Sequence, residues 1–294
     1  MWIYIQGVMI LAFINVISVV GLSIFTGFTG MFSMGHAAFI AIGAYTATIL
    51  TYYLNFNFYI ALLIGGLVSG LMSLVIGIPT LRANLRKDYF AIATMGFGEA
   101  IRVLLENLKI TQGARGLPGI ASYTNFWNVI VITILIIILA RNFVFSKYGR
   151  RAIAVREDFT AAEMMGINLF AVRLGSLFFS AVCAGIGGGL FAHYINFIQP
   201  SMFTGLQSTM LSCTVVAGGL GSITGPVIAA LLFAAIPEFL RVANMWRMVI
   251  YGVVLVCIIV LRPEGIFGYK EISFPSYRIL WRGSSKADKT KGRR

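Results

Sequence analysis

The first 81 residues contain no lysine, arginine, aspartate or glutamate, and this charge-free stretch limits the possible folds more than any other feature. Over all 294 residues only 11% are charged and 59% are hydrophobic, whereas soluble domains carry about 25% charged residues. Apolar runs of about 20 residues, enough to cross the bilayer as a helix, recur along the chain. These runs lack the alternation of membrane β-strands. The sequence therefore predicts an all-α, polytopic transmembrane helical bundle.

We expect eight or nine membrane spans in this bundle. The first is predicted to be retained rather than cleaved, because it has no positive flank and further apolar sequence follows it at once. The run at 207–220 is short for a crossing, which indicates a broken or re-entrant helix. The expected spans cover residues 2–24, 36–53, 57–78, 89–105, 126–145, 174–196, 207–220, 224–241 and 246–262.

Positive charges are concentrated in three segments. With an odd number of spans in total, these segments all lie on the side of the membrane opposite the N-terminus. Residues 79–87, 146–173 and 262–294 together hold 17 of the 23 lysines and arginines. The positive-inside rule makes this side cytoplasmic, with the N-terminus outside. We expect the basic tail to contact anionic lipid rather than nucleic acid, because it directly follows the last span.

A compact group of charges at residues 146–173, called here the charged segment, divides the chain into two apolar parts. We interpret it as a cytoplasmic loop to which a soluble partner docks. The predicted organisation is an N-terminal transmembrane half at 1–145, the cytoplasmic loop at 146–173, a C-terminal transmembrane half at 174–262 and a basic cytoplasmic tail at 263–294.

Helix-capping signals lie inside the charged segment. Thr160 and Glu163 form a T-x-x-E capping box, in which each side chain can bond the other residue's backbone N–H. Asp158 is a competing N-cap, and Gly166 offers a C-terminal stop. We predict a short helix over residues 159–165.

The next residues extend this interpretation. Asn168 is expected to cap the membrane helix that follows, and Phe159, Met164 and Met165 give the short helix an apolar surface. A stiff cytoplasmic helix with such a surface can transmit force from a docked partner to the spans behind it.

Glycine is clustered, with GxxxG spacing at Gly66/Gly70 and dense groups at 187–189 and 218–221. Such spacing allows close helix packing, which we favour for Gly66 and Gly70. The denser groups also weaken the helix locally, so packing and bends beside a translocation path both remain open for them. Gly188 and Gly219 are accordingly candidate path residues.

Few polar side chains fall within the predicted spans. His36 lies in a stretch rich in glycine and hydroxyl residues, and we expect it to bond a neighbouring carbonyl, with lining of the path as the alternative. Glu99, Arg102 and Glu106 share one helix face. Because Glu99 is predicted near the bilayer centre, these charges indicate either an ionic clamp between helices or a network bordering the path.

Catalytic and metal-binding motifs are missing from the sequence. It has no GxxxxGK[ST] phosphate loop, HExxH or GxSxG. Cys183, Cys213 and Cys257 lie in apolar spans without CxxC spacing, and only two histidines are present, so neither a disulfide framework nor a metal site is predicted. We expect a transport subunit that is not an enzyme and binds no cofactor.

Six segments, in order, resemble the branched-chain amino-acid permeases of ABC importers, specifically the M-type subunit of the permease pair. The resemblance covers most of the chain from residue 21 to 268. The segments are GFTGMFSMGHAAFIAIGAYTA (27–47), DYFAIATMGFGEAIR (88–102), TQGARGLPGI (111–120), AAEMMGIN (161–168), VVAGGLGSITGPVIAA (215–230) and LRPEGIFG (261–268).

The resemblance implies how the charged segment is used. ABC importer permeases carry an E-A-A-x-x-x-G pattern that docks on the ATPase, and Ala161, Ala162 and Gly166 match it, whereas Thr160 replaces its leading Glu. Any acidic contact with the ATPase that the leading Glu makes would therefore have to come from Glu157, Asp158 or Glu163. The expected ATPase-coupling residues are Glu157, Asp158, Thr160, Ala161, Ala162, Glu163, Gly166 and Asn168.

Family membership further implies a second permease subunit, two cytoplasmic ATP-binding subunits that hold ATP and Mg, and an extracytoplasmic binding protein in a bacterial cytoplasmic membrane. We expect that protein to dock near 106–125 and 197–207. The predicted function is import of branched-chain amino acids. Alternatives are import of urea, short amides or another small polar solute, or an ion-coupled secondary transporter, for which no internal repeat is evident.

Overall fold

The computed structural model describes residues 2–83, 87–239, 252–253 and 265, and these residues are almost entirely helical. Apart from 252–253 and 265, the predicted span at 246–262 and the basic tail lie outside the described residues, as does Cys257. The elements are α1 (Trp2–Thr29), α2 (His36–Tyr52), α3 (Phe58–Arg82), α4 (Lys87–Asn107), η1 (Gly113–Arg115), β1 (Leu117–Pro118), α5 (Phe126–Phe145), α6 (Lys147–Glu157), α7 (Phe159–Met164), α8 (Leu169–Ile195), β2 (Phe197–Ile198), η2 (Pro200–Met202), α9 (Gly205–Gly218) and α10 (Thr224–Phe239).

Within the described residues, four helices are long and apolar enough to cross a membrane: α1, α3, α5 and α8. Two shorter apolar helices lie at His36–Tyr52 and Thr224–Ala235. The chain is thus an integral membrane protein whose helices coincide with the predicted apolar runs to within a few residues. α9 has only 14 residues, as expected for the short run at 207–220.

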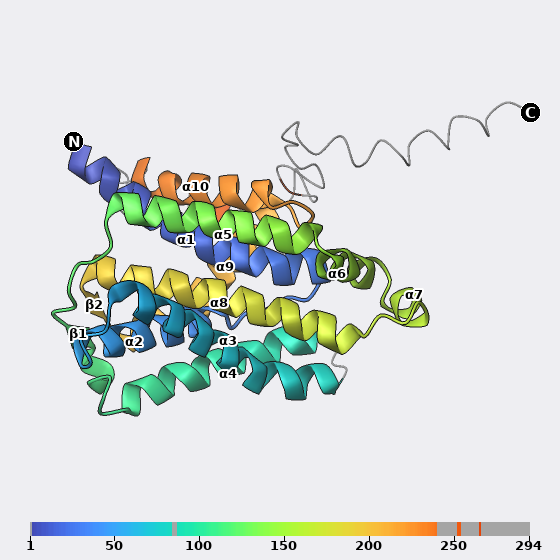
Figure 1. The fold of residues 1–294 in the computed structure, drawn as a ribbon, viewed down its shortest axis with the longest axis horizontal. Helices are drawn as coiled ribbons and strands as arrows, with labels where there is room; N and C mark the ends of the chain where they lie inside the picture. Colours follow the sequence, from blue (N-terminus) through green and yellow to red (C-terminus); the bar gives the residue numbers. More distant parts are fainter. Residues whose placement is uncertain (1, 84–86, 240–251, 254–264, 266–294) are drawn as a thin grey trace, which may run out of the picture.

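The long helices run roughly along one axis, and the two ends of the bundle differ (Figure 1). α6 and α7 lie at one end, where α7 projects beyond the other helices. The N-terminus, β1 and β2 lie at the opposite end. α8 is the central helix and packs against α1, α2 and α3.

Glycines allow the close approach of the central helices. Gly43 of α2 faces the backbone of Gly185 on α8, so a Cβ atom on Gly43 would collide with α8, while a Cβ atom on Gly185 would collide with Ser69 of α3. Gly65 of α3 lies against the Gly43 carbonyl. Ser69 Oγ donates to the carbonyls of Phe39 and Ala181, both at 2.9 Å, which ties the same three helices together. Since lipid provides no hydrophobic drive for helix association, this close packing carries the stability.

The two dense glycine groups have different structures. α8 continues as one helix through 187–189, where Gly188 lies against the Ile40 carbonyl of α2, so packing explains this group. The group at 218–221 instead ends α9, and Gly219 has φ +120°, a conformation that favours glycine. The chain then turns back and Gly225 of α10 packs on the Gly218 carbonyl. As predicted, Gly66 and Gly70 pack on α8.

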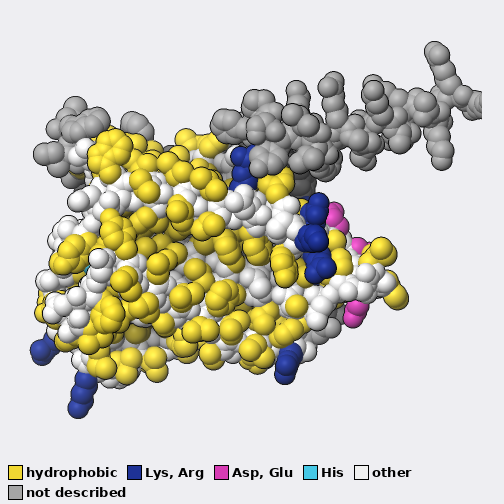
Figure 2. Space-filling view, viewed as in Figure 1, with side chains coloured by type: hydrophobic (Ala, Val, Ile, Leu, Met, Phe, Trp, Pro, Cys, Tyr) yellow, Lys and Arg dark blue, Asp and Glu magenta, His cyan; other side chains and the backbone are white. Residues whose placement is uncertain are grey.

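A belt of hydrophobic side chains covers the face shown in Figure 2, while charged side chains gather toward its ends. On α3 the exposed residues Leu63, Leu67, Leu71 and Val75 repeat every four positions. This spacing forms one apolar stripe along the helix. Such a stripe suits contact with lipid.

Candidate functional site

The charged segment begins with a helix that the sequence analysis did not predict. Ser146 Oγ accepts hydrogen bonds from the backbone N–H groups of Tyr148 at 3.1 Å and Gly149 at 3.4 Å, and so caps the N-terminus of α6. The signal available in the sequence was this serine at the end of an apolar run. α6 therefore connects α5 rigidly to the short helix that follows.

α7 confirms the predicted short helix but corrects its cap. Asp158 Oδ1 accepts from the backbone N–H groups of Thr160 at 2.8 Å and Ala161 at 3.0 Å. The expected capping box of Thr160 and Glu163 is wrong, because the helix begins at Phe159 and Thr160 already lies inside its first turn. A carboxylate also suits the positive end of the helix dipole better than a hydroxyl.

Gly166 ends α7 as predicted. Its φ is +76°, its N–H donates to the Glu163 carbonyl at 2.9 Å, and the Ile167 N–H donates to the Ala162 carbonyl at 3.1 Å. These two bonds form a Schellman motif. Asn168 Oδ1 then accepts from the Ala171 N–H at 3.0 Å and caps α8, which was also predicted. Hydrogen bonds therefore fix both ends of the turn between α7 and α8.

Apolar side chains cover the outer surface of α7. Met164 is 85% exposed and Met165 is 81% exposed, with Phe159 also exposed, whereas Ala162 is buried against the rest of the segment. The helix projects past the end of the bundle (Figure 1), away from the apolar belt. Large exposed apolar groups outside the membrane-facing belt mark a surface for binding another protein.

Arg156, near the end of α6, was missed by the sequence analysis. Its Nη1 donates to the carbonyl oxygens of Gly27 at 2.9 Å and Leu220 at 3.3 Å, and its side chain is only 16% exposed. Gly27 belongs to the last turn of α1, and Leu220 lies in the turn between α9 and α10. Its Nη2 also pairs with Glu157 Oε1 at 2.6 Å. Arg156 thus joins the charged segment to the end of α1 and to the turn between α9 and α10.

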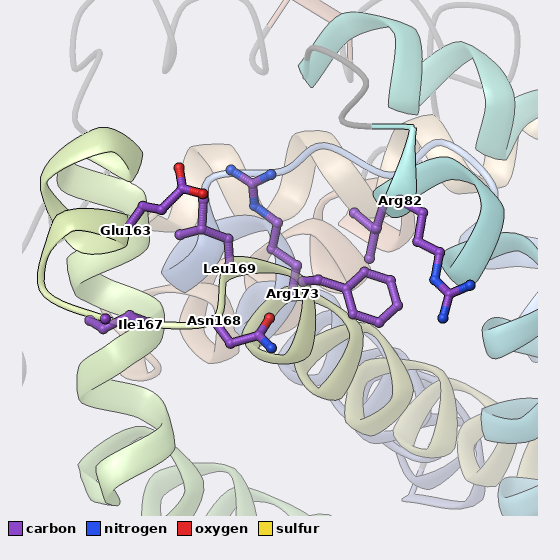
Figure 3. A pocket seen from close by; sticks show the side chains of 9 residues that line it. Arg82, Glu163, Ile167, Asn168, Leu169 and Arg173 are labelled. Atoms are coloured by element: carbon purple, nitrogen blue, oxygen red, sulfur yellow. The ribbon is translucent and has the colours of Figure 1, made fainter.

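A cavity of about 530 Å³ lies between α7, the start of α8 and the end of α3. Figure 3 shows Glu163 and Arg173 extending toward one another, with Arg82 farther from Glu163 than Arg173 is. The Arg82 guanidinium lies 5.7 Å from the centre of the Phe170 ring. This cavity separates the projecting helix from the bundle on the side away from α6.

At the opposite end, the two loops predicted to receive a binding protein lie together. Leu117 pairs with Ile198 and Pro118 with Phe197 in a two-stranded antiparallel ladder. Gly116 has φ +77°, and a Cβ at this position would collide with the Ile198 carbonyl. The ladder joins residues 106–125 to 197–207 at the end farthest from α7 (Figure 1).

The charges of α4 pair within that helix. Arg102 Nε lies 2.8 Å from Glu99 Oε2, and its Nη1 bonds Glu106. No partner from another helix appears among the described residues, so the expected ionic clamp between helices is not formed there. The Glu99 side chain is 43% exposed although it lies roughly 18 Å along the helix from Lys87.

The other candidate path residues are enclosed or lie apart. His36 is fully buried, with Nε2 2.8 Å from Ser180 Oγ and Nδ1 3.3 Å from Ser33 Oγ. Its partners are hydroxyl groups, rather than the carbonyl expected, and they connect α2 to α8. Gly188 is buried in the same helix pair, while Gly219 lies at the break after α9. Of these three, His36 begins the helix that approaches α4, since the Gly35 Cα lies 3.5 Å from where a Cβ on Gly98 would stand.

Comparison with known proteins shows similarity over nearly the whole chain. The family described as the branched-chain amino acid transport system / permease component matches residues 4–259. The high-affinity branched-chain amino acid transport system permease protein LivM of Salmonella typhimurium is 32% identical over 288 residues, covering 86% of this chain and 67% of that protein. LivM of Escherichia coli is 31% identical, covering 87% and 68%. No solved structure matches.

More distant relatives have other stated substrates. The autoinducer 2 import system permease protein LsrC of Yersinia enterocolitica is 26% identical over 215 residues, covering 68% of this chain and 58% of that protein. Similarity therefore extends across permeases of several transport systems, with higher identity and coverage for the two LivM proteins.

Proposed function

Because the chain belongs to the family of branched-chain amino acid permease components, we propose that it is one permease subunit of an ATP-driven importer for leucine, isoleucine, valine or similar amino acids. Permease components of this kind are transport subunits rather than enzymes. The proposed importer also contains a second permease, two ATP-binding subunits that hold ATP and Mg, and an extracytoplasmic binding protein. The two LivM relatives, at 31–32% identity, support the choice of substrate.

The observation that carries this proposal is the projecting helix α7 with its exposed Phe159, Met164 and Met165. An ATPase subunit that lacks any membrane attachment of its own needs a firm contact on the permease. A capped helix that ends in a defined glycine turn supplies a rigid surface for that contact. The proposed docking residues are those at 157–168 predicted from the sequence.

We place the α7 end in the cytoplasm of a bacterium. The charged segment contributes five of the 23 lysines and arginines, and positive loops are retained on the cytoplasmic side. The loops joined by β1 and β2 then lie outside, where a binding protein can deliver substrate. The whole chain has eight or nine spans in this arrangement, with halves at 1–145 and 174–262 on either side of the docking loop.

Movement of the docked ATPases reaches the membrane helices through α6. Arg156 bonds carbonyls at the end of α1 and in the turn between α9 and α10. A shift of α7 therefore displaces α6. Through Arg156, α6 in turn displaces the end of α1 and the turn between α9 and α10. Gly219, with φ +120°, makes the turn beside this contact.

The substrate path follows the membrane face that carries Asn15, Glu99 and Arg102. Asn15 is exposed and lies roughly 20 Å along α1 from its start, so it is deep in the bilayer. Exposed polar groups at this depth are unfavourable against lipid and instead face protein or water. The second permease therefore covers this face, and His36 and Gly188 hold α2 against α8 behind it.

Co-purification with the two ATPases tests the docking assignment. Met164→Glu together with Met165→Glu is expected to lower ATPase retention at least tenfold, because both side chains leave an apolar contact. Leu54→Glu changes a similarly exposed apolar residue at the opposite end and is expected to leave retention unchanged. Equal retention of the ATPases by the double variant and by wild type would contradict the proposal.

A further inference from the structure

A cavity of about 450 Å³ opens between α1, α9 and α10 on the face that carries Asn15. Phe191, near the end of α8, and Thr204, just before α9, place it in the half of the bundle nearer β1 and β2. Its volume falls in the range of sites that enclose small molecules, which is about 300–1,000 Å³. The docking helix α7 lies at the other end of the bundle (Figure 1).

Most of the cavity wall is apolar. It includes Leu11, Val19, Met210, Leu211 and Phe233, and no charged side chain is among the described residues that line it. An apolar wall without fixed charge suits an aliphatic group on a molecule with no net charge.

The polar groups of the cavity are two amides and two hydroxyls. The amides belong to Asn15 and Gln207, and the hydroxyls to Thr204 and Thr214. Thr214 Oγ1 already donates to the Met210 carbonyl at 2.8 Å. Gln207 Oε1 is buried and has no hydrogen-bond partner among the described residues. A buried amide oxygen is normally paired, so this one lacks the hydrogen bond that its burial calls for.

We infer that this cavity holds the transported amino acid during its passage, with the aliphatic side chain against the apolar wall and the amides of Gln207 and Asn15 contacting its charged backbone groups. This inference rests on the proposed function and adds the site at which the permease itself contacts the substrate. Gln207 Oε1 accepts from the ammonium group of the amino acid. The Asn15 amide donates to its carboxylate.

The approach to the cavity is consistent with this assignment. Glu99 Oε1 lies 3.6 Å from where a Cβ on Gly205 would stand, which places the paired charges of α4 beside the first turn of α9. Thr204, the residue before Gly205, lines the cavity. A zwitterion entering from the outer end would thus pass from the α4 carboxylates and Arg102 to neutral amides.

Two substitutions test the site in the complete transporter reconstituted in proteoliposomes, with leucine-loaded binding protein at saturation. Gln207→Leu removes the amide but keeps the size of the side chain. Leucine transport per ATP hydrolysed is expected to fall about tenfold, the effect of losing about one hydrogen bond to a charged group. The melting temperature is expected to stay equal or rise, because the removed oxygen has no partner in the protein.

Ala234→Trp provides a second test by filling the cavity, and it is expected to lower leucine transport at least tenfold while basal ATP hydrolysis remains. Matched controls are Thr209→Leu, on α9 outside the cavity lining, and Leu135→Trp, on the exposed surface of α5. Both are expected to transport leucine as wild type does.

The outcomes separate the site from the function. Wild-type rates in both Gln207→Leu and Ala234→Trp, in a transporter whose wild type imports leucine, would overturn the site alone. A lower melting temperature in Gln207→Leu that accounts for all of its lost transport would also overturn it. Failure of the wild type to import leucine would overturn the proposed function instead.

Discussion

Arg156→Ala is expected to uncouple ATP hydrolysis from transport. The substitution removes two hydrogen bonds from a charged donor, to the Gly27 carbonyl at 2.9 Å and the Leu220 carbonyl at 3.3 Å. Bonds to charged groups contribute about 1.5–3 kcal/mol each, and the longer one is taken at the lower end. The ion pair with Glu157, whose side chain is 66% exposed, adds at most about 1 kcal/mol.

These contributions set the size of the effect. A loss of about 3 kcal/mol corresponds to about a 150-fold change in the population of the state in which α6 is bonded to the Gly27 and Leu220 carbonyls. Leucine imported per ATP is therefore expected to fall at least tenfold. Arg156→Lys keeps the charge but not the planar fork, and we expect an intermediate loss. Arg151→Ala is the matched control, since Arg151 is an exposed residue of the same helix whose contact is the Tyr148 ring.

The assay measures uptake of radiolabelled leucine and release of phosphate in the same proteoliposomes, with the melting temperature of each variant recorded separately. ATP hydrolysis is expected to continue in Arg156→Ala while uptake falls. A folded Arg156→Ala transporter whose uptake per ATP lies within twofold of wild type would refute the reasoning.

Three further substitutions test the local structure. Asp158→Ala removes the α7 cap, at a cost of about 1 kcal/mol, and is expected to speed hydrogen exchange of the α7 amides about fivefold; unchanged exchange would show that Asp158 is not the cap. Gly43→Leu is expected to prevent assembly because a side chain there meets Gly185, whereas Gly96→Leu enters open space and is expected to assemble. Ser69→Ala breaks two bonds of about 0.6 kcal/mol each and is expected to lower the melting temperature of the detergent-solubilised protein; an unchanged value would contradict their contribution.

The apolar runs and the caps of the charged segment could be predicted because their signals are local. Twenty uncharged residues have few alternatives to a membrane helix. Asn168 and Gly166 act through backbone groups within three or four residues of themselves. The choice between Asp158 and Thr160 as the cap was not settled by the sequence, because both residue types are favoured at N-caps and only the start of α7 at Phe159 decides between them.

The contacts that connect distant segments could not be predicted. In the sequence, Arg156 is one of five lysines and arginines in the charged segment, yet its partners are backbone carbonyls 129 and 64 positions away along the chain. Gln207 appears as a polar residue in a short apolar run, and only the arrangement of α1, α9 and α10 shows that it borders a cavity. A bond to a backbone carbonyl does not depend on which side chain its partner residue carries, and a cavity depends on how distant helices pack. Neither the role of Arg156 nor that of Gln207 was therefore visible in the sequence.

The function is tested most directly by ATP-driven uptake of radiolabelled leucine into proteoliposomes that contain this chain, its second permease, the two ATPases and the leucine-loaded binding protein. We predict uptake that requires ATP, is inhibited by excess isoleucine and valine, and is unaffected by excess urea. Uptake that proceeds without ATP, or that urea inhibits while isoleucine and valine do not, would contradict the assignment as a branched-chain amino acid permease.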